Sequence, residues 1–194
     1  RHLAASRERA RALITAGAVL VNGLPAAKPG TIVSIQSSIT LKTDDFPYVS
    51  RGGLKLEKAL KSFPVDLEAA VCLDIGASTG GFTDCLLQHG ARKVYAVDVG
   101  YGQLAWKLRQ DARVVAIERT NARHMSPDAI PEKVDLVTID VSFISLRLIV
   151  PAVLPMMKRA AGLIVLIKPQ FEVGKGQVGK GGVVKDDRLH QDVI

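Results

Sequence analysis

Residues 71–83 read VCLDIGASTGGFT, and this stretch decides the fold of the larger part of the chain. Its first five residues are apolar apart from Asp74, a composition typical of a strand that is buried on both faces. Glycines at 76, 80 and 81 then allow the backbone to turn sharply into a helix and to approach a ligand closely. The stretch therefore predicts a strand, a tight turn and a helix, with a ligand site at the turn.

Four more aliphatic or β-branched runs follow, and helical patterns separate several of them. The predicted strands are 71–75, 93–97, 114–117, 134–139 and 163–167, and the predicted helices are 81–88, 102–109 and 146–158. Pro151 and Pro155 should kink or split the last helix. This alternation predicts an α/β domain with a doubly wound, mostly parallel sheet that binds ligands at the carboxyl ends of its strands.

The first 42 residues follow a different pattern. A short amphipathic helix is expected from its N-cap Ser6 to Gly17, and residues 18–26, AVLVNGLPA, predict a strand that ends in an Asn-Gly turn. Residues 31–35 and 38–42 are expected to form further short strands. A helix and a few short strands predict a small α+β domain.

An acidic stretch with a proline, residues 43–50, separates the two patterns. We therefore expect the small domain over 1–45, a linker at 46–50 and the α/β domain over 51–194.

The net charge of +7 is unevenly distributed along the chain. Residues 1–62 hold ten basic and four acidic residues, whereas residues 63–194 hold sixteen and fifteen. Such an asymmetry predicts a polyanion-binding module joined to a nearly neutral body, and nucleic acid is the commonest polyanion. A merely solvated basic surface is the alternative.

Composition excludes several classes of protein. Hydrophobic residues make up 47% and charged residues 23% of the chain, as in a globular protein. No uninterrupted apolar run approaches the roughly 18 residues of a spanning helix, and no signal peptide is visible. Cys72 and Cys85 lack a metal-ligand spacing, so we expect no metal and a reducing, cytoplasmic location.

The turn after the first strand favours one kind of cofactor. A dinucleotide fingerprint would need a second glycine where Ser78 stands. Asp74 would repel a pyrophosphate but could receive an ammonium group, while the helix N-terminus receives a carboxylate. Those two groups make an amino acid, and S-adenosylmethionine carries one. Asp98 could then bind the ribose hydroxyls and Asn121 the adenine edge, although both aspartates could instead cap neighbouring helices.

This set of residues resembles the cofactor site of class I methyltransferases with a Rossmann-like fold. The run that begins at Asp74, DIGASTGGFT, is close to the form seen in ribose methyltransferases of the FtsJ type. The resemblance implies S-adenosylmethionine as cofactor, with contacts from Asp74, Gly76, Ser78, Gly80, Gly81, Phe82, Asp98, Asn121 and Asp140.

Three charged residues are candidates for the chemistry. Asp140 follows the strand at 134–139, Lys168 follows the strand at 163–167, and Lys55 lies on the helix that opens the domain. Charges at the ends of buried strands are costly unless they are paired. A ribose 2′-hydroxyl is a weak acid, so its attack on a methyl group benefits from a desolvated lysine beside a carboxylate.

We therefore expect Lys168 to be the general base, Asp140 to orient it and Lys55 to stabilise the developing alkoxide. A structural ion pair is the alternative for Lys168 and Asp140, and Lys58 or Lys61 could stand in place of Lys55 as a solvated lysine of the same helix.

Residues 6–42, with their SRxxAxxLIxxG and VxVNG motifs, resemble the S-four-type RNA-binding module. The resemblance implies RNA contacts from the Arg-bearing helix and the turns beside it, namely from Arg7, Arg9, Arg11, Asn22 and Lys28.

With YVSRGGLKL and KPQFEVGK added, the whole chain resembles the TlyA, or hemolysin A-like, family. That resemblance implies S-adenosylmethionine-dependent 2′-O-methylation of cytidines in 16S or 23S ribosomal RNA, with rRNA or ribosomal subunits as partners. It also implies a Lys-Asp-Lys-Glu tetrad whose Glu would follow Ile194, and a helix that would precede Arg1. We therefore expect both domains to be incomplete and the fragment to be impaired.

Three rival functions remain open. A non-catalytic RNA-binding protein with a relic methyltransferase fold would not need Asp74, Asp98, Asp140 and Lys168. A cytolysin would need a secretion route and an inserting segment. Nucleotide hydrolysis would need a phosphate loop, and the run at 174–181 has its spacing, but Gly181 replaces the Ser or Thr that would hold magnesium. A basic loop that uses Lys175 and Lys180 to cover RNA is the better functional interpretation, and plain disorder is the alternative.

Overall fold

The structure is a computed structural model that describes residues 3–4, 7–15, 17–41, 47–174 and 176–194. The chain divides into two compact units, Arg1–Phe46 and Pro47–Ile194. Each unit is described by itself. Residues 47–50, which were expected in the linker, belong to the second unit because the Tyr48 side chain is buried there and Val49 N donates to Asp84 Oδ2 over 2.7 Å.

The first unit contains one helix and three short strands. They are α1 (Arg7–Thr15), β1 (Val19–Val21), β2 (Leu24–Pro25) and β3 (Ile39–Leu41). The strands form an antiparallel sheet in the order β2-β1-β3. Asn22 and Gly23, with φ angles of 50° and 81°, make the predicted turn between β1 and β2, where two positive φ angles suit a two-residue hairpin.

The strand expected at 31–35 is absent from the described first unit, so that prediction was wrong. Instead Thr31 turns back on Lys28, since both its backbone N and its hydroxyl donate to the Lys28 carbonyl, over 3.3 and 2.9 Å. Ile32 is 97% exposed, so its β-branched side chain has no core to enter.

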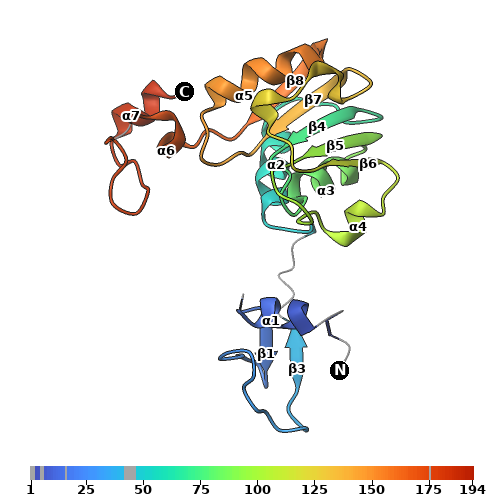
Figure 1. The fold of residues 1–194 in the computed structure, drawn as a ribbon, viewed down its shortest axis with the longest axis vertical. Helices are drawn as coiled ribbons and strands as arrows, with labels where there is room; N and C mark the ends of the chain where they lie inside the picture. The colour runs from blue at the N-terminus through green and yellow to red at the C-terminus, as the bar shows by residue number, and fades with distance from the viewer. Residues whose placement is uncertain (1–2, 5–6, 16, 42–46, 175) are drawn as a thin grey trace. The chain divides into compact units, whose positions relative to one another are not determined.

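The second unit is built on a five-stranded sheet, and it confirms the predicted α/β fold (Figure 1). Its strands are β4 (Val71–Ile75), β5 (Lys93–Val97), β6 (Val114–Ile117), β7 (Val134–Ile139) and β8 (Met157–Val165). All are parallel, in the order β6-β5-β4-β7-β8. The first four strands and α3 (Gly81–Gln88) have the bounds that the sequence predicts.

The predicted helix at 146–158 was too long. Helix α5 (Leu146–Val153) keeps Pro151 inside it, but a 3₁₀ turn, η3 (Leu154–Met156), carries Pro155 and ends the helical path. Strand β8 starts at the next residue, six residues before the predicted start, and ends two residues sooner. Proline in the first turn of η3 is compatible with a fresh start there and not with continuation of an α-helix.

The other helices are short, apart from the one that opens the unit. They are α2 (Gly52–Ser62), α4 (Trp106–Arg109), α6 (Pro169–Glu172) and α7 (Asp187–Asp192), with 3₁₀ turns η1 (Ala122–His124) and η2 (Pro127–Ala129). Helix α4 is shorter than predicted because Gly102, at φ 72°, holds the preceding segment in a loop.

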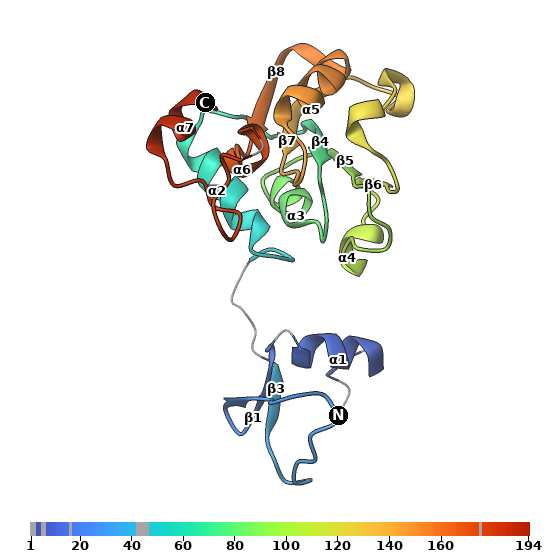
Figure 2. The ribbon, with the colours of Figure 1, turned by 60° about the vertical axis from the view of Figure 1, so that its left-hand side comes forward.

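Helices cover both faces of the sheet (Figures 1 and 2). On one face, buried leucines of α2, α3 and α4, such as Leu56, Leu86 and Leu108, pack on the sheet. On the other, Ile149 and Val153 of α5 pack against strand residues. Burial of each such side chain contributes about 1.5–3 kcal/mol.

Glycines allow α2 and α3 to start in close contact. A Cβ atom at Gly81 would lie 2.4 Å from Ser50 Oγ and 2.8 Å from Gly53 N. This close approach fixes the start of α2 beside the glycine turn, and α2 carries Lys55.

Candidate active site

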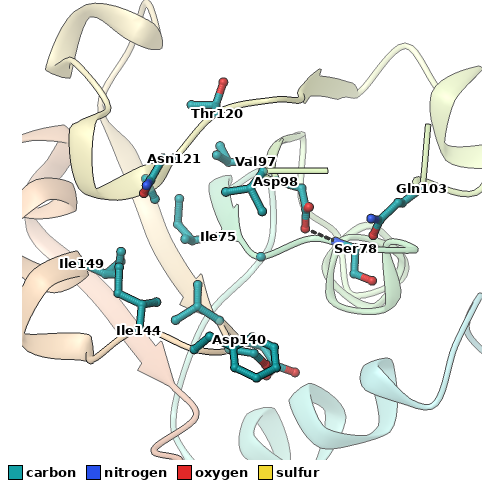
Figure 3. Close-up of a pocket in the computed structure, with 16 residues that line it drawn as sticks. Ile75, Ser78, Val97, Asp98, Gln103, Thr120, Asn121, Asp140, Ile144 and Ile149 are labelled. Atoms are coloured by element: carbon teal, nitrogen blue, oxygen red, sulfur yellow. Dashed lines mark hydrogen bonds between the residues drawn. The ribbon is translucent and has the colours of Figure 1, made fainter. Parts of the chain in front are cut away.

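A cavity of about 430 Å³ opens at the carboxyl ends of the strands (Figure 3). Its walls come from the segments that follow β4, β5, β6 and β7, as expected for an open parallel sheet. The lining residues are Ile75, Gly76, Ser78, Val97, Asp98, Val99, Gln103, Thr120, Asn121, Ala122, Asp140, Val141, Ser142, Phe143, Ile144 and Ile149. Five residues predicted from the sequence to bind the cofactor are therefore together: Gly76, Ser78, Asp98, Asn121 and Asp140.

The polar end of the cavity is organised by Asp98. Its Oδ2 accepts a hydrogen bond from Ser78 N over 2.8 Å, and its Oδ1 accepts one from Gly100 N over 2.7 Å (Figure 3). Ser78 has a φ of 51°, and Gly76 has one of 84°. A Cβ at Gly76 would lie 2.7 Å from the Asp140 carbonyl, so glycine is required there on two grounds.

Asp74 occupies a different place from Asp98 and Asp140, because its side chain is fully buried. Its two oxygens accept hydrogen bonds from Thr83 Oγ1 over 2.7 Å and from Thr138 Oγ1 over 3.0 Å. Burial raises the pKa of Asp74 to about 6, although the threonine hydrogen bonds act in the opposite direction. Asp74 thus ties α3 to β7, and its predicted contact with an ammonium group stays a prediction.

The remaining predicted cofactor residues, Gly80, Gly81 and Phe82, do not line the larger cavity. Gly81 and Phe82 line a smaller cavity, of about 140 Å³, together with Gly76, Ser78 and Asp140 of the larger one; its other lining residues are Ser50, Gly52, Ala77 and Thr79. Gly80 lines neither, and a Cβ there would meet Leu108 and Leu104 of the adjoining segment at 2.3 and 2.8 Å. Its place in the structure is explained by packing and by its φ of 94°.

The three predicted catalytic residues meet at Asp140. Lys168 Nζ lies 2.6 Å from Asp140 Oδ1, and Lys55 Nζ lies 3.0 Å from Asp140 Oδ2. Lys168 Nζ also donates to the Val141 carbonyl over 2.8 Å and to Ser142 Oγ over 3.0 Å. Burial alone would raise the pKa of Asp140, but the two lysines outweigh it and hold that pKa below its usual value.

The geometry distinguishes Lys55 from the other lysines of α2. Lys61 pairs with Glu57 at 3.2 Å, and Lys58 is exposed. Lys55 is half-exposed, with 53% of its side-chain surface accessible, whereas the Lys168 side chain is 22% accessible. Lys168 is therefore the better shielded of the two cations at Asp140.

Sequence reasoning missed an aromatic pair beside this ion cluster. Phe143 lines the cavity yet is 91% exposed, and it adopts a φ of 64° that bulky residues rarely adopt. Its ring lies 5.1 Å from that of Phe171, which follows Lys168 on α6. Both residues stand in the same strand-end segments as Asp140 and Lys168, which is the signal that could have found them.

Gln103, Thr120, Ile144 and Ile149 were also missed. Gln103 and Thr120 line the cavity from loops in which the sequence shows no motif, whereas Ile144 lies in the segment that follows Asp140 and Ile149 lies on α5. Their positions depend on how the loops fold over the sheet edge, which local pattern does not encode.

The predicted RNA-contacting residues lie in the first unit. Arg7, Arg11, Asn22 and Lys28 are exposed, and Asn22 Oδ1 accepts a hydrogen bond from Ser38 N over 2.9 Å. Arg9 lies in α1, but its side chain is outside the described part.

The described residues of the glycine-rich run, 174 and 176–181, belong to no helix or strand and line neither cavity. Lys175 lies outside the described residues, and Lys180 is exposed. No group of three or more potential metal ligands occurs in the part of the chain that the structure describes. Over the same residues, none of the helices combines the length and apolar character that a membrane crossing requires.

Comparisons with known proteins agree with this geometry. A family model described as FtsJ-like methyltransferase matches residues 48–194, and one described as S4 domain matches residues 1–39. The chain is 56% identical to the Mycobacterium tuberculosis protein named 16S/23S rRNA (cytidine-2′-O)-methyltransferase TlyA, over 97% of this chain and 71% of that one.

Two further similarities point the same way. The chain is 45% identical to the Brachyspira hyodysenteriae protein named Hemolysin A, over 97% of this chain and 79% of that one. It also superposes on a Streptococcus thermophilus structure that bears a hemolysin name, with a TM-score of 0.77 and 47% identity, over 98% of this chain and 70% of that one.

Proposed function

Because the chain belongs to the FtsJ-like methyltransferase family, we propose that it transfers a methyl group from S-adenosylmethionine to a ribose 2′-hydroxyl of ribosomal RNA. The observation that carries the proposal is the Lys168–Asp140–Lys55 cluster at the edge of a cofactor-sized cavity. A relative that is 56% identical is named for the same reaction on cytidine, so cytidine is the proposed target nucleotide.

The residues of the large cavity fit this cofactor. Asp98 offers a carboxylate suited to ribose hydroxyls, and Asn121 offers an amide suited to an adenine edge. Apolar side chains, such as those of Ile75, Val97 and Ile149, supply a surface for a flat ring. Gly76 and Ser78 of the glycine turn line the same cavity, so the turn lies beside the amino-acid end of the cofactor in this proposal.

The chain's own residues then perform the transfer. When bound, the cofactor supplies a methyl group on a positively charged sulfur, which is an electrophile. Lys168 first releases a proton to solvent, and its neutral Nζ then accepts the proton of the 2′-hydroxyl as the oxygen bonds to the methyl group and the methyl–sulfur bond breaks. Lys55 Nζ stabilises the negative charge that develops on the oxygen. Asp140 holds both amine groups within 3.0 Å and so fixes their positions relative to each other.

The exposed ring of Phe143 has a use in the same reaction. A nucleotide whose ribose reaches Lys168 must lose its stacking on the neighbouring bases. Stacking on an aromatic side chain stabilises the base in this unstacked position. Phe143, backed by Phe171, offers that surface at the cavity mouth.

Labelled methyl transfer tests the proposed function. The protein is incubated with methyl-labelled S-adenosylmethionine and either purified rRNA or ribosomal subunits, and the product nucleosides are separated by mass. We expect label in 2′-O-methylcytidine. Label on a base, or none with any of these substrates, would contradict the proposal.

The first unit provides a separate prediction about RNA. Simultaneous substitution of Arg7, Arg9 and Arg11 by Ala should weaken rRNA binding and flatten its dependence on salt, because fewer phosphate counterions are released. The slope of log affinity against log salt should fall by about 0.9 for each lost phosphate contact. Substitution of Arg113, which pairs with Asp111 in the second unit, is the matched control and should leave the slope unchanged.

The reaction would take place where ribosomes are assembled, so the proposal includes a cytoplasmic location.

A further inference from the structure

Two strand-end segments of the site are joined by three successive sets of side-chain contacts. They are residues 140–146, which lead from β7 into α5, and residues 168–172, which lead from β8 through α6. Lys168 contacts Asp140, Val141 and Ser142; the ring of Phe171 lies against that of Phe143; and Glu172 contacts the start of α5. The contacts of Lys168 and of the Phe143–Phe171 pair already have roles in the proposed reaction, whereas the contact of Glu172 has not yet been assigned one.

Glu172 makes the third connection with both of its carboxylate oxygens. Ser145 Oγ donates to Oε2 over 2.6 Å, and Leu146 N donates to Oε1 over 2.8 Å. Ser145 Oγ also accepts a hydrogen bond from Arg147 N over 3.1 Å and so caps α5. A carboxylate at the first turn of a helix satisfies amides that have no partner within the helix. Glu172 therefore holds the start of α5 through two contacts of its carboxylate.

The conformation of the loop between Asp140 and Ser145 is fixed by hydrogen bonds at its two ends. At one end Asp140 N donates to the Ile75 carbonyl over 3.0 Å, and at the other Ser145 and Leu146 are held by Glu172. In between, Phe143 adopts a φ of 64°, which is unfavourable for a bulky residue and persists only if the surroundings enforce it. The same loop provides the two oxygens that hold Lys168 Nζ.

We propose, on the premise of the methyl-transfer function above, that Glu172 is a positioning residue of this site. By holding the start of α5, its carboxylate fixes the loop at 141–145, and this loop in turn fixes the Lys168 amine beside Asp140. The substrate hydroxyl then meets Lys168 at a defined position. Loss of Glu172 leaves every group of the ion cluster present but less well aligned.

Three variants test this role. Glu172→Ala removes both contacts of the carboxylate, and Glu172→Gln keeps an acceptor for Leu146 N. Ser145→Ala removes one of the two contacts to Glu172 together with the N-cap hydrogen bond from Arg147 N. The control is Glu132→Ala, because Glu132 is equally well connected, to Tyr95, Lys93 and Arg92, but lies at the amino ends of the strands. Thermal melting measures the stability of each variant. Calorimetry gives the number of S-adenosylmethionine sites per chain, so that the rate of each variant can be expressed per folded molecule.

Two readouts separate positioning from stability. Hydrogen exchange of the Leu146 amide, in protein without cofactor, should become faster in Glu172→Ala and in no segment outside 140–148. The kcat per folded molecule should fall about tenfold to a hundredfold, a size typical of misplacement by about 1 Å. Glu172→Gln should recover most of the rate, and Glu132→Ala should lower stability with kcat unchanged.

The proposal is overturned if kcat per folded molecule in Glu172→Ala equals that of Glu132→Ala, or if Leu146 exchange is unaffected. If Glu172→Ala does not fold, Ser145→Ala carries the test with a smaller change of the same sign, and an unchanged kcat there overturns the proposal too. Absence of ribose methylation by the unsubstituted protein is a different result: it contradicts the proposed function, while the exchange measurement still reports on the contact.

Discussion

The ends of β4 and β7 carry carboxylates on neighbouring strands, and the two have opposite surroundings. Asp74 is fully buried and accepts hydrogen bonds from two threonine hydroxyls, and burial raises its pKa to about 6. Asp140 lies between two lysines, which hold its pKa below the usual value in spite of burial. Asp74 is the fourth of the five residues of β4 and pairs with Thr138, whereas Asp140 follows the last residue of β7, so the two carboxylates stand at different positions along the sheet.

The difference assigns the two carboxylates to different tasks. Hydroxyl partners satisfy a carboxyl group whether it is protonated or charged, so Asp74 can join α3 to β7 as a structural link. Ammonium partners favour the charged form, so Asp140 remains an anion that can position amines. A carboxylate next to a reacting lysine must be charged in order to orient it, and Asp140 meets that condition because Lys55 and Lys168 hold its pKa below the usual value.

The largest effect is expected from substitution of Lys168, which pairs with Asp140. Lys168→Ala removes the proposed proton acceptor, so single-turnover methyl transfer should slow about 10²- to 10⁴-fold, the range typical of a general base. Lys168→Arg should be almost as slow because a guanidinium retains its proton. Lys58→Ala, an exposed lysine of the helix that carries Lys55, is the control and should transfer at the normal rate. A normal rate in Lys168→Ala would make the cluster a structural ion pair.

Replacement of Asp140 by Asn should have the second largest effect. The amide keeps the shape but leaves Lys55 and Lys168 without their anion, so transfer should slow about tenfold to a hundredfold through loss of alignment. The pKa of Asp140 is lowered by folding, so this group stabilises the protein above its unfolded pKa and loses that contribution as pH falls. The variant should therefore show a shallower loss of stability on the acid side, measured by denaturant unfolding between about pH 5 and pH 2.

The same substitution at Asp74 should give the opposite sign. Since folding raises the pKa of Asp74 from 3.8 to about 6, the folded state binds an additional proton between these values. Stability from this group is therefore complete below pH 3.8 and falls as pH rises through about 6. Asp74→Asn mimics the protonated form, so its free energy of unfolding should lack this decline, a difference of about 2–3 kcal/mol by pH 7.

Denaturant unfolding at pH 4, 5, 6 and 7 measures how the free energy of unfolding declines with pH in the unsubstituted protein and in Asp74→Asn. The rate of methyl transfer by Asp74→Asn is measured as well. A rate within a few-fold of normal would support the structural role. A large loss of S-adenosylmethionine affinity with normal stability would instead support the ammonium contact that the sequence predicts.

The comparison also explains what the sequence could and could not predict. The bounds of β4, β5, β6 and β7 were predictable because each is a short apolar run between breaks. Asp140 and Lys168 were found because charges at strand ends are costly without partners, and Lys55 was a candidate as a lysine of the helix that opens the domain. The different states of Asp74 and Asp140 were not predictable, since Thr138 reaches Asp74 only once β7 lies beside β4, and Thr83 reaches it only from the folded helix α3.

The N-terminal segments and the loops were predicted less well for a related reason. Residues 31–35 have strand propensity but form no strand among the described residues, where Ile32 is 97% exposed, and the length of α5 depends on where β8 begins to pair with β7. Phe143 and Glu172 lie in segments whose partners are 26 to 28 residues away in the sequence, so local pattern gives no sign of their contacts.

The smallest effect should come from one hydroxyl on the Asp74 side. Thr138→Val keeps the shape of the side chain but removes its hydrogen bond to Asp74 Oδ1, so unfolding free energy should fall by about 1 kcal/mol. Because that hydrogen bond lowers the pKa of Asp74, its loss should move the pKa above about 6, and NMR titration of the carboxyl carbon would measure the change. Thr120→Val, whose hydroxyl donates to the Glu118 carbonyl, is a matched control that should leave this titration unchanged. If the titration also stayed unchanged in Thr138→Val, the hydroxyls would not determine the charge of Asp74, and burial alone would account for its difference from Asp140.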